Sequence, residues 1–346
     1  MTDVAEIRDV RLCLLGFGHV AQRFCEMLSD RSTVLQERHG LRVLVTAVGT
    51  GRHGSFTDPI GVPASEVLRE FRTGVAGFAG DAVPAAQLIA DSGADALVES
   101  TPQEHGGATA IAHVEQAFDS GLDVITVNKG PVAWAYGRLK ANATARGRQF
   151  RFEGVTMDGC PVYNLAEFCL PGDRVIGFRG VLNSTTNYAL DAMAEGASLA
   201  EALAEAQAEG IAETDPTYDI EGHDAAAKVA ALANVLLDAD ITPDDVERDS
   251  IAALTADDVA RVVSYGRRLR VICSGTVDED DAVTAQATLE PIRSDDPMYW
   301  ISGTSSALVL ECELAGTVEI VERDGDLTQT AYAIYADLLT MHGRRS

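Results

Sequence analysis

Apolar runs alternate with amphipathic stretches over the first part of the chain. A short apolar run that ends in a small or polar residue is typical of a strand buried on both faces of a sheet, whereas the stretches between the runs have helical spacing. The runs lie at 10–17, 41–49, 96–100 and 123–128, and the helical stretches lie near 19–30, 64–74, 84–92 and 105–120. This alternation predicts a doubly wound α/β fold, in which helices cover both faces of a parallel sheet.

The pattern changes after about residue 150. Residues 174–182 and 282–290 alternate like strands, and the region between them is rich in alanine and helical. An amphipathic helix over about 328–343 ends the chain, and we expect it to return to the first domain because its apolar face needs a partner. We therefore predict one domain over 9–150, completed by this last helix, and a mixed α/β domain over 151–325.

Composition narrows the possible partners and the compartment. The net charge is −26, and the acidic residues are scattered along the chain. Nucleic-acid binding is disfavoured because phosphate neutralisation needs clustered cations, and no apolar run approaches the ~20 residues of a membrane span. The first residues lack the basic and apolar regions of a signal peptide, and the six cysteines are dispersed. These features predict a reduced, soluble, cytoplasmic protein without a membrane or nucleic-acid partner.

Lysine is almost absent, since the chain contains only Lys129, Lys140 and Lys228. An even acidic coat with few lysines indicates a cytoplasm rich in salt, where carboxylates stay hydrated and their repulsion is screened; an ordinary acidic enzyme is the alternative. The pKa of a lysine ammonium shifts readily on burial, whereas a guanidinium effectively cannot lose its proton. Two of the lysines lie inside motifs, which favours proton-transfer chemistry over chance survival.

A glycine turn follows the first predicted strand and opens the first predicted helix. Its residues are Gly16, Phe17, Gly18, His19, Val20 and Ala21. In a dinucleotide-binding turn the first glycine makes the bend, the second lets pyrophosphate approach the backbone, and a small third residue permits close helix–strand packing. The pyrophosphate would rest on the helix N-terminus. We therefore predict a dinucleotide site here, with a plain strand-to-helix connection as the alternative.

The end of the second predicted strand bears on the choice of cofactor. The chain reads Thr50-Gly51-Arg52-His53 at this point, without the Asp or Glu that would hold the ribose hydroxyls of NAD. Arg52 is suited to a 2′-phosphate instead, which favours NADP over NAD, with an ordinary loop arginine as the alternative.

Asp224 and Lys228 are spaced so that a carboxylate and an ammonium share one helix face. The residues that follow are strongly apolar, so the helix is expected to be buried, and a buried ammonium needs a partner. An acidic cluster lies upstream and comprises Glu213, Asp215, Asp219 and Glu221. This cluster is either a solvated loop or a site for a cationic amino group of a substrate. The run of small hydrogen-bonding side chains at 182–188 fits a helix cap or a polar ligand.

Taken together, these motifs resemble the homoserine dehydrogenase family. The ordered set is the glycine turn, VNKGPVA, EGVTMDGCPV, GVLNSTTNYALDAM, AETDPTYDIEGHDAAAKVAALAN, DPMYWISGTSSALVL and TAYAIYADL, and it covers nearly the whole chain. The resemblance implies a Rossmann-type domain, a mixed α/β lobe for substrate binding and dimerisation, and a core form without a regulatory domain. It also implies the reversible oxidation of L-homoserine to L-aspartate 4-semialdehyde with NADP or NAD by a homodimer, on the route to threonine and methionine.

The resemblance also assigns roles to individual residues. Lys129 and Lys228 match the family's two active-site lysines, and Asp224 matches the carboxylate that faces the second. Substrate-contacting positions are matched by Glu213, Asp219, Ser184 and Thr185. Cofactor contacts, besides the glycine turn, are matched by Ser100, Thr101 and Lys129. A monovalent cation, expected to be sodium, is implied at Glu153 and the backbone carbonyls near Thr156, Asp158 and Cys160.

Two segments depart from the family pattern. Residues 156–160 read Thr-Met-Asp-Gly-Cys where the family has a glycine-rich stretch, and residues 322–326 read Glu-Arg-Asp-Gly-Asp where it has Gly-Pro-Gly-Ala-Gly. The second change places charged residues near the expected nicotinamide pocket. Two alternatives follow: a related dehydrogenase of another small amino or hydroxy acid, and a catalytically silent NADP-binding regulatory protein. The two retained lysines argue against the silent protein.

Overall fold

The chain forms two compact units, seen in a computed structural model that describes residues 7–74, 78 and 83–343. The first unit comprises Met1–Gly159 and Leu327–Ser346, and the second comprises Cys160–Asp326. The division falls after residue 159 rather than at about 150, because the strand at Phe150–Arg151 pairs with the sheet of the first unit.

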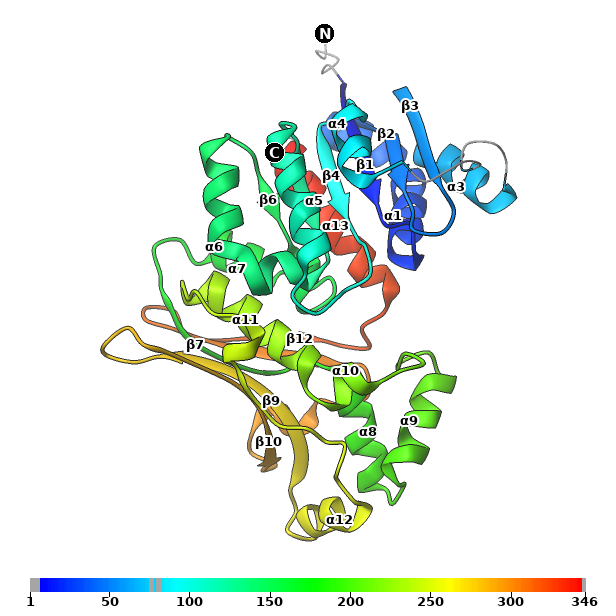
Figure 1. The fold of residues 1–346 in the computed structure, drawn as a ribbon. Helices are drawn as coiled ribbons and strands as arrows, with labels where there is room; N and C mark the ends of the chain where they lie inside the picture. The colour runs from blue at the N-terminus through cyan, green and yellow to red at the C-terminus, as the bar shows by residue number, and fades with distance from the viewer. Residues whose placement is uncertain (1–6, 75–77, 79–82, 344–346) are drawn as a thin grey trace. The chain divides into compact units, whose positions relative to one another are not determined.

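The first unit is built on a six-stranded sheet with the order β3-β2-β1-β4-β5-β6 (Figure 1). Its strands are β1 (Arg8–Leu15), β2 (Leu41–Gly49), β3 (Ser55–Val62), β4 (Ala96–Glu99), β5 (Asp123–Thr126) and β6 (Phe150–Arg151). Its helices are α1 (His19–Asp30), α2 (Ser32–His39), α3 (Ala64–Thr73), α4 (Ala85–Asp91), α5 (Ala108–Asp119), α6 (Lys129–Ala145), the short turn η2 (Glu153–Val155) and α13 (Leu327–His342).

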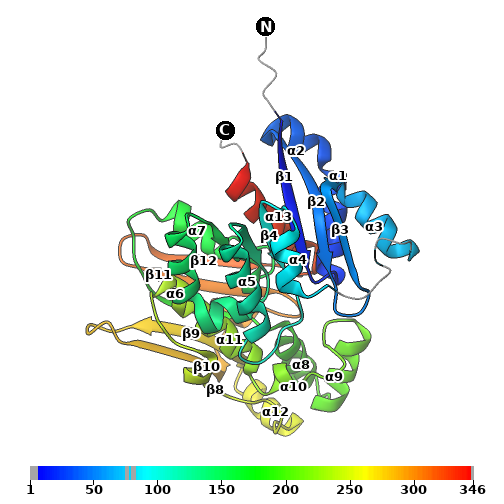
Figure 2. The same ribbon diagram turned by 45° about the horizontal axis from the view of Figure 1, so that its top comes forward.

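Alternate residues of β1 supply the two faces of this sheet. Leu12 and Leu14 belong to a core cluster with residues of α1, α2, α3 and α13, whereas Leu15 belongs to a second cluster with residues of α4, α5 and α6. Burying each such leucine contributes about 1.5–3 kcal/mol relative to leaving it exposed. Figure 2 shows α1, α2 and α3 on one side of β1–β3 and α4 on the other. The prediction of helices on both faces is confirmed, and α13 packs against α1 in the first unit.

The sheet is not wholly parallel, contrary to the prediction. Strand β3 runs antiparallel to β2, because the chain reverses at 50–54 and pairs back instead of crossing over through a helix. The turn is closed by two hydrogen bonds, from Thr50 N and Thr50 Oγ1 to the carbonyl of Gly54, at 3.1 and 2.8 Å. Strand β3 is not predicted by the sequence pattern, and neither is the hairpin that carries Arg52.

The second unit is also built on a six-stranded sheet, with the order β12-β11-β7-β9-β10-β8. Its strands are β7 (Val175–Val181), β8 (Glu247–Arg248), β9 (Arg268–Val277), β10 (Val283–Ile292), β11 (Ser306–Cys312) and β12 (Gly316–Glu322). Its helices and 3₁₀ turns are α7 (Val162–Cys169), α8 (Ser184–Ala194), α9 (Leu199–Ala208), α10 (Thr217–Ile220), α11 (His223–Leu236), α12 (Ala256–Ser264), η3 (Pro243–Asp245) and η4 (Pro297–Trp300). The pairing of β8 with β10 is parallel, and the other pairings are antiparallel.

Helix α11 lies against β9 and β10, and its sequence explains how it can approach them. The helix presents a run of fully buried alanines, which bring its backbone close to the sheet: Ala225, Ala226, Ala227, Ala230, Ala231 and Ala233. On β9, a Cβ added at Gly275 would lie 2.5 Å from the ring of Phe178, so only glycine leaves room for that ring. This close packing holds Asp224 and Lys228, both on α11, against the core of the second unit.

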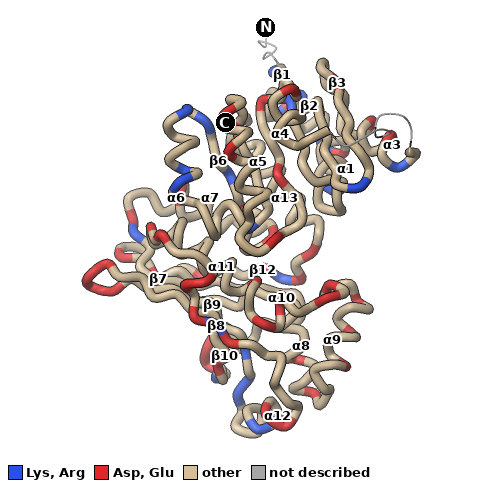
Figure 3. The backbone as a smooth tube through the Cα atoms, in the orientation of Figure 1, with Lys and Arg blue, Asp and Glu red and all other residues tan. Residues whose placement is uncertain are grey.

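Acidic residues occur along elements of both units rather than in one segment (Figure 3). This distribution matches the scattered acidic composition of the chain. Within the described residues, no helix combines the length and the apolar character that crossing a membrane requires.

Candidate active site

The glycine turn lies between β1 and α1 and fits a dinucleotide in two respects. Gly16 has a φ of +85°, and an added Cβ would clash with the carbonyl group of Ser100, so the position requires glycine. Gly16 N also donates to Gly49 O at 3.0 Å, which fixes the bend against β2. A Cβ added at Gly18, by contrast, would meet nothing within 4 Å. The backbone is therefore closely packed at Gly16 and has open space beside Gly18, which is the arrangement that pyrophosphate binding needs.

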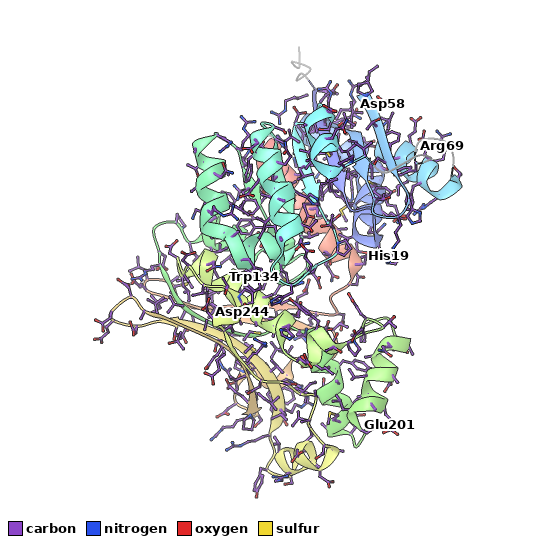
Figure 4. All side chains as sticks on the ribbon, viewed as in Figure 1. His19, Asp58, Arg69, Trp134, Glu201 and Asp244 are labelled. Atoms are coloured by element: carbon purple, nitrogen blue, oxygen red, sulfur yellow. The ribbon has the colours of Figure 1, made fainter. Side chains whose placement is uncertain are left out.

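The remaining residues of the turn divide between packing and exposure. The Phe17 ring is buried, 5.0 Å from the ring of Phe71, and Ala21 is buried against the sheet, while Val20 packs at the edge of the same core. Phe17 and Ala21 are therefore expected to offer mainly their backbone to a ligand, whereas Val20 is partly exposed. His19 is exposed at the first position of α1, where Figure 4 shows its side chain at the end of the helix. Gly18 caps this helix without a side-chain hydrogen bond, which suits an anion at its N-terminus.

Ser100 and Thr101 follow β4 and lie beside the glycine turn. Ser100 N donates to Leu15 O at 2.8 Å, and its hydroxyl lies 3.2 Å from the carbonyl oxygen of Gly16. Thr101 donates from its hydroxyl and from its N–H group to the carboxylate of Glu99, which is fully buried. The structure thus brings Ser100 to the glycine turn and fixes Thr101 through a residue that sequence analysis did not single out.

Lys129 is the first residue of α6, and its position is set by the residue before it. Asn128 is 4% exposed and caps the helix by accepting from Gly130 N at 2.9 Å. The Lys129 ammonium donates to Gln103 Oε1 at 3.1 Å. A Cβ added at Gly107 would lie 2.5 Å from the Cα atom of Gly130, so the loop before α5 touches the start of α6 backbone to backbone. Lys129 therefore extends from a closely packed corner of the first unit.

Arg52 lies exposed in the hairpin turn between β2 and β3. Within this turn, His53 N donates to Thr50 Oγ1 at 2.7 Å. The Arg52 side chain is exposed to solvent. The turn leads directly from the carboxyl end of β2, where a dinucleotide ribose lies in this type of fold.

The second unit gathers a compact polar cluster around Lys228. Its ammonium lies 2.5 Å from the carbonyl oxygen of Leu182 and 3.3 Å from Asp224 Oδ2. The side-chain amide of Asn183 donates to Asp219 Oδ1 at 2.8 Å and to Asp224 Oδ2 at 2.9 Å. The Lys228 ammonium and the Asn183 amide therefore contact the carboxylates of Asp219 and Asp224 between them. The Lys228 side chain is only 15% exposed.

Electrostatics in this cluster favour the arrival of a cation. Burial and then the negative charge of Asp224 raise the pKa of Asp219 above its usual range, although its hydrogen bonds to Asn183 and Thr185 oppose the shift. A cationic group that approached Asp219 would relieve this repulsion. Burial raises the pKa of the nearby Cys273 thiol to about 12, which favours its protonated form.

The other predicted substrate contacts lie around this cluster or at its edge. Ser184 and Thr185 form the first turn of α8, which Asn183 caps by accepting from Thr186 N at 2.8 Å. Glu213 is exposed in the loop before α10, and its carbonyl oxygen accepts from Gln207 Nε2 at 3.0 Å. The polar cluster around Lys228 and the start of α8 thus lie together within the second unit. Glu213 lies on the surface, in the loop before α10.

The residues predicted to bind a monovalent cation lie on the segment 153–160. Glu153 and Thr156 are buried in the first unit, and Asp158 has a φ of +40° and accepts from the hydroxyl of Thr330 at 2.8 Å. Cys160 begins the second unit. No group of three or more His, Cys, Asp or Glu residues suited to a metal occurs among the described residues. Any cation here would be held largely by backbone carbonyls, as expected for a monovalent ion.

The two segments that depart from the family pattern have structural explanations of their own. A Cβ added at Gly159 would lie 2.6 Å from Gln329 O, so this glycine is required where the other small residues have been replaced. In the segment 322–326, Glu322 ends β12 and is buried, and Asp324 has a φ of +51° and donates its N–H group to Ser305 Oγ at 3.2 Å. These residues shape turns within their own units.

The predicted site residues fall into two groups, one in each unit. The first unit holds the glycine turn, Ser100, Thr101 and Lys129, and the second holds Lys228, Asp224, Asp219, Ser184 and Thr185. Two buried residues that fix the first group, Glu99 and Asn128, are not predicted by the sequence patterns. Asn183 lies in the run at 182–188, and the prediction that this run can cap a helix is confirmed. Asn128 also has a sequence signal, since it stands directly before a predicted site residue at the start of a helix.

Known proteins resemble this chain over almost its whole length. A sequence profile of the family described as homoserine dehydrogenase matches residues 161–339. The NAD(+)-dependent homoserine dehydrogenase of Pseudomonas canavaninivorans is 34% identical over 339 residues, with 96% of each chain covered. The homoserine dehydrogenase of Methanocaldococcus jannaschii is 32% identical over 337 residues, which cover 96% of this chain and 98% of the relative.

A solved structure supports the fold independently. The crystal structure of homoserine dehydrogenase from Thermoplasma acidophilum aligns with a TM-score of 0.83, covering 96% of this chain and 99% of the other. The sequence identity over this alignment is 23%, so the likeness speaks for the architecture alone.

Proposed function

This chain belongs to the homoserine dehydrogenase family, and on that premise we propose how its residues share the work of the reaction. The activity is that of an NAD(P)-dependent oxidoreductase, which converts L-homoserine to L-aspartate 4-semialdehyde reversibly. The two alternatives, another small-acid dehydrogenase and a silent regulatory protein, find no support among the relatives. The residue roles, the cofactor preference and the oligomeric state are the proposals that follow.

Lys228 exchanges the proton of the substrate hydroxyl. Its ammonium is 2.5 Å from Leu182 O and 3.3 Å from Asp224 Oδ2, which are an acceptor and a counter-charge for the protonated form. Asp224 stabilises the ammonium once Lys228 has taken the proton, and the carbonyl holds it in place. The nicotinamide, when bound, supplies the hydride acceptor. Lys129 stabilises the negative charge that develops on the substrate oxygen, an electrostatic role; exchanging the roles of the two lysines is the alternative.

Asp219, with Glu213, pairs with the amino group of homoserine. Burial and then the charge of Asp224 raise the pKa of Asp219, so an ammonium group beside this carboxylate would stabilise its ionised form. The start of α8 suits the substrate carboxylate, because the first turn of a helix carries partial positive charge and Ser184 and Thr185 add hydroxyl groups. Charged ends of the substrate are thus held on either side of Asn183.

The cluster of Lys228, Asp224, Asn183 and Asp219 is the observation that carries this proposal. The direct test is the absorbance at 340 nm of the purified protein with L-homoserine and each nicotinamide cofactor, at low and at molar salt. We expect cofactor reduction that depends on L-homoserine. No reduction with either cofactor under any salt condition would overturn the proposed function.

Arg52 makes the protein prefer NADP. The residue is exposed just past the carboxyl end of β2, where it can grip a 2′-phosphate. The relative from Pseudomonas canavaninivorans is an NAD(+)-dependent enzyme, so NAD is the competing choice. Replacing Arg52 by alanine should raise the KM for NADP at least tenfold and change the KM for NAD less than twofold. Equal changes in both would make Arg52 an ordinary turn residue.

The second sheet has one partly covered face, and this face supports a homodimer. Helix α11 lies on the face that carries Phe178. On the opposite face Val181, Ile272 and Ala307 are buried with Met298 and Ile301, whereas Arg179, Thr276 and Glu311 are half-buried or exposed in the single chain. The exposed part of this face is where a second copy would stack. Light scattering after size exclusion should give twice the chain mass, and a monomer at micromolar concentration would contradict this.

Three further assignments stay predictions. These are the sodium ion on the segment 153–160, the role in threonine and methionine synthesis, and the cytoplasmic location. The sodium ion is tested by measuring activity in sodium, potassium and choline chloride at equal ionic strength. Equal rates in all three salts would contradict a role for sodium in activity.

A further inference from the structure

A closed ring of hydrogen bonds ties together the loops that follow β4 and β5 in the first unit. Glu99 Oε1 accepts from Thr101 N at 3.2 Å and from the Thr101 hydroxyl, and the other oxygen accepts from Thr126 Oγ1 at 3.2 Å. Thr126 Oγ1 in turn accepts from Asn128 N at 3.0 Å. The amide of Asn128 closes the ring by donating to Thr101 O at 3.1 Å.

The ring is buried at its centre. Glu99 and Thr126 are fully buried, and Asn128 is 4% exposed. The imidazole of His113, on α5, lies 3.5 Å from Glu99 Oε1 and is 12% exposed. A buried carboxylate is costly unless its oxygens are satisfied, and here each oxygen accepts at least one hydrogen bond from the ring. Removing the Thr126 hydroxyl takes the ring's bond from Glu99 Oε2, and removing the Glu99 carboxylate takes the acceptor from both Thr101 and Thr126, so a change at either residue affects the whole ring.

Two proposed active-site residues depend on this ring. Thr101, a proposed cofactor contact, is held directly by Glu99. Lys129 follows Asn128, whose side chain caps α6 through Gly130 N at 2.9 Å while its backbone N–H group reaches Thr126. The same carboxylate thus sets the direction of Thr101 on one side and of the helix that begins with Lys129 on the other.

We propose that Glu99 is a positioning residue that holds Thr101 and Lys129 in register with each other for hydride and proton transfer. This inference rests on the roles proposed above for those two residues. A displacement of about 1 Å in a catalytic group can cost on the order of 100-fold in rate. Loosening the ring should therefore lower kcat and weaken the cofactor, whereas the proposed homoserine contacts belong to the second unit and should change little.

Glu99→Leu removes both acceptor oxygens, and Glu99→Gln keeps the shape and one of them. Thr126→Val removes the bridging hydroxyl without changing the size of the side chain, and Thr126→Ser restores that hydroxyl. Thr46→Val is the matched control, because Thr46 is also fully buried on a strand of the same sheet and gives its hydroxyl to Leu12 O at 3.3 Å, outside the ring. Each variant is assayed for kcat, for the KM of both substrates, and for thermal unfolding.

We expect Glu99→Leu and Thr126→Val to lower kcat at least tenfold and to raise the KM for the cofactor, with the KM for homoserine changed less than threefold. Glu99→Gln should fall between Glu99→Leu and the wild type, Thr126→Ser should regain most of the activity, and Thr46→Val should lose stability but keep kcat within twofold.

The outcomes separate this inference from the proposed function. A wild-type protein that does not oxidise homoserine refutes the proposed function, whatever the variants do. A wild-type protein that is active, with Glu99→Leu and Thr126→Val no slower than Thr46→Val, refutes the positioning role alone. If Glu99→Leu does not fold, the comparison of Thr126→Val with Thr126→Ser decides, and equal kcat values for these two would overturn the inference.

Discussion

Replacing Lys228 by alanine removes the ammonium group and so tests its proposed role in proton transfer. The ammonium lies 2.5 Å from Leu182 O and 3.3 Å from Asp224 Oδ2, and the side chain is 15% exposed. Loss of a proton-transfer group typically costs ~10²–10⁴ in rate, which corresponds to about 3–5 kcal/mol of transition-state stabilisation. We expect kcat to fall by this factor while the affinity for the cofactor changes less than threefold, because the glycine turn belongs to the other unit.

The same substitution should also destabilise the fold by a measurable amount. Removing one partner of a buried ion pair costs about 3–5 kcal/mol, and the residual exposure of Lys228 and Asp224 places the expected loss near the lower limit, about 3 kcal/mol. The pKa of Asp219 is already raised by burial and by Asp224, and it should rise further without the ammonium. A carboxyl whose folded-state pKa is raised binds protons more readily in the folded state, so the stability deficit should grow with rising pH and shrink in acid.

The chain offers a matched control in its third lysine. Lys140 is exposed on α6, with its ammonium 5.1 Å from the centre of the Tyr136 ring, a contact worth about 0.5–1 kcal/mol at an exposed site. Lys140→Ala should therefore keep kcat within twofold. Absorbance at 340 nm gives kcat, nicotinamide fluorescence gives cofactor affinity, and all assays run below the unfolding midpoint of the weaker variant. Lys228→Ala with more than a tenth of wild-type kcat would remove Lys228 from proton transfer.

Three further predictions concern the glycine turn, the acidic cluster and the surface. Gly16→Ala should destabilise the first unit by more than about 2 kcal/mol, because its φ is +85° and the new methyl group clashes with Ser100; Gly18→Ala should leave thermal stability nearly unchanged yet weaken cofactor binding, and the reverse order would refute the reading of the turn. Asp219→Asn should raise the KM for homoserine, and it should gain stability relative to wild type as pH rises through the Asp219 pKa, since it removes a carboxylate that burial and Asp224 disfavour; an unchanged KM would exclude Asp219 from substrate binding. The net charge of −26 predicts that the unfolding midpoint rises from ~0.1 M to ~2 M salt as repulsion is screened; an equal midpoint at both would show that the acidic coat is not an adaptation to salt.

The sequence predicted well those elements whose signals are local. The helix expected near 19–30 is α1 (His19–Asp30), and the strand expected at 41–49 is β2 (Leu41–Gly49). In both, the apolar spacing reports directly which face is buried. Strand β3 (Ser55–Val62) was not predicted, because it contains Asp58, Pro59 and Gly61. Much of the strand is exposed at the edge of the sheet. Its sequence therefore lacks the apolar run that marks the central strands.

The candidate site shows the same division between local and long-range signals. Asp224 and Lys228 are four residues apart on one helix, so their pairing follows from helical geometry. The link from Asn183 to Asp224 spans 41 positions, and the link from Thr126 to Glu99 spans 27. Such contacts depend on how strands are ordered in each sheet, which the spacing of apolar residues does not encode. Glu99 in particular looked like the polar end of a strand.

The two asparagines that cap helices at the proposed site, Asn128 and Asn183, have the same arrangement of hydrogen bonds. Asn128 and Asn183 each cap a helix with the side-chain oxygen, accepting from Gly130 N and from Thr186 N respectively. Each uses the amide nitrogen for two further bonds: Asn128 donates to Thr101 O at 3.1 Å and to Pro102 O at 3.5 Å, and Asn183 donates to two carboxylates. Aspartate or serine would cap a helix as well as asparagine does. Aspartate has no proton to donate once ionised, however, and a serine hydroxyl has only one. Only asparagine combines the cap with two outward donors, so the requirement of the site, rather than of the helix, explains the amide at both positions.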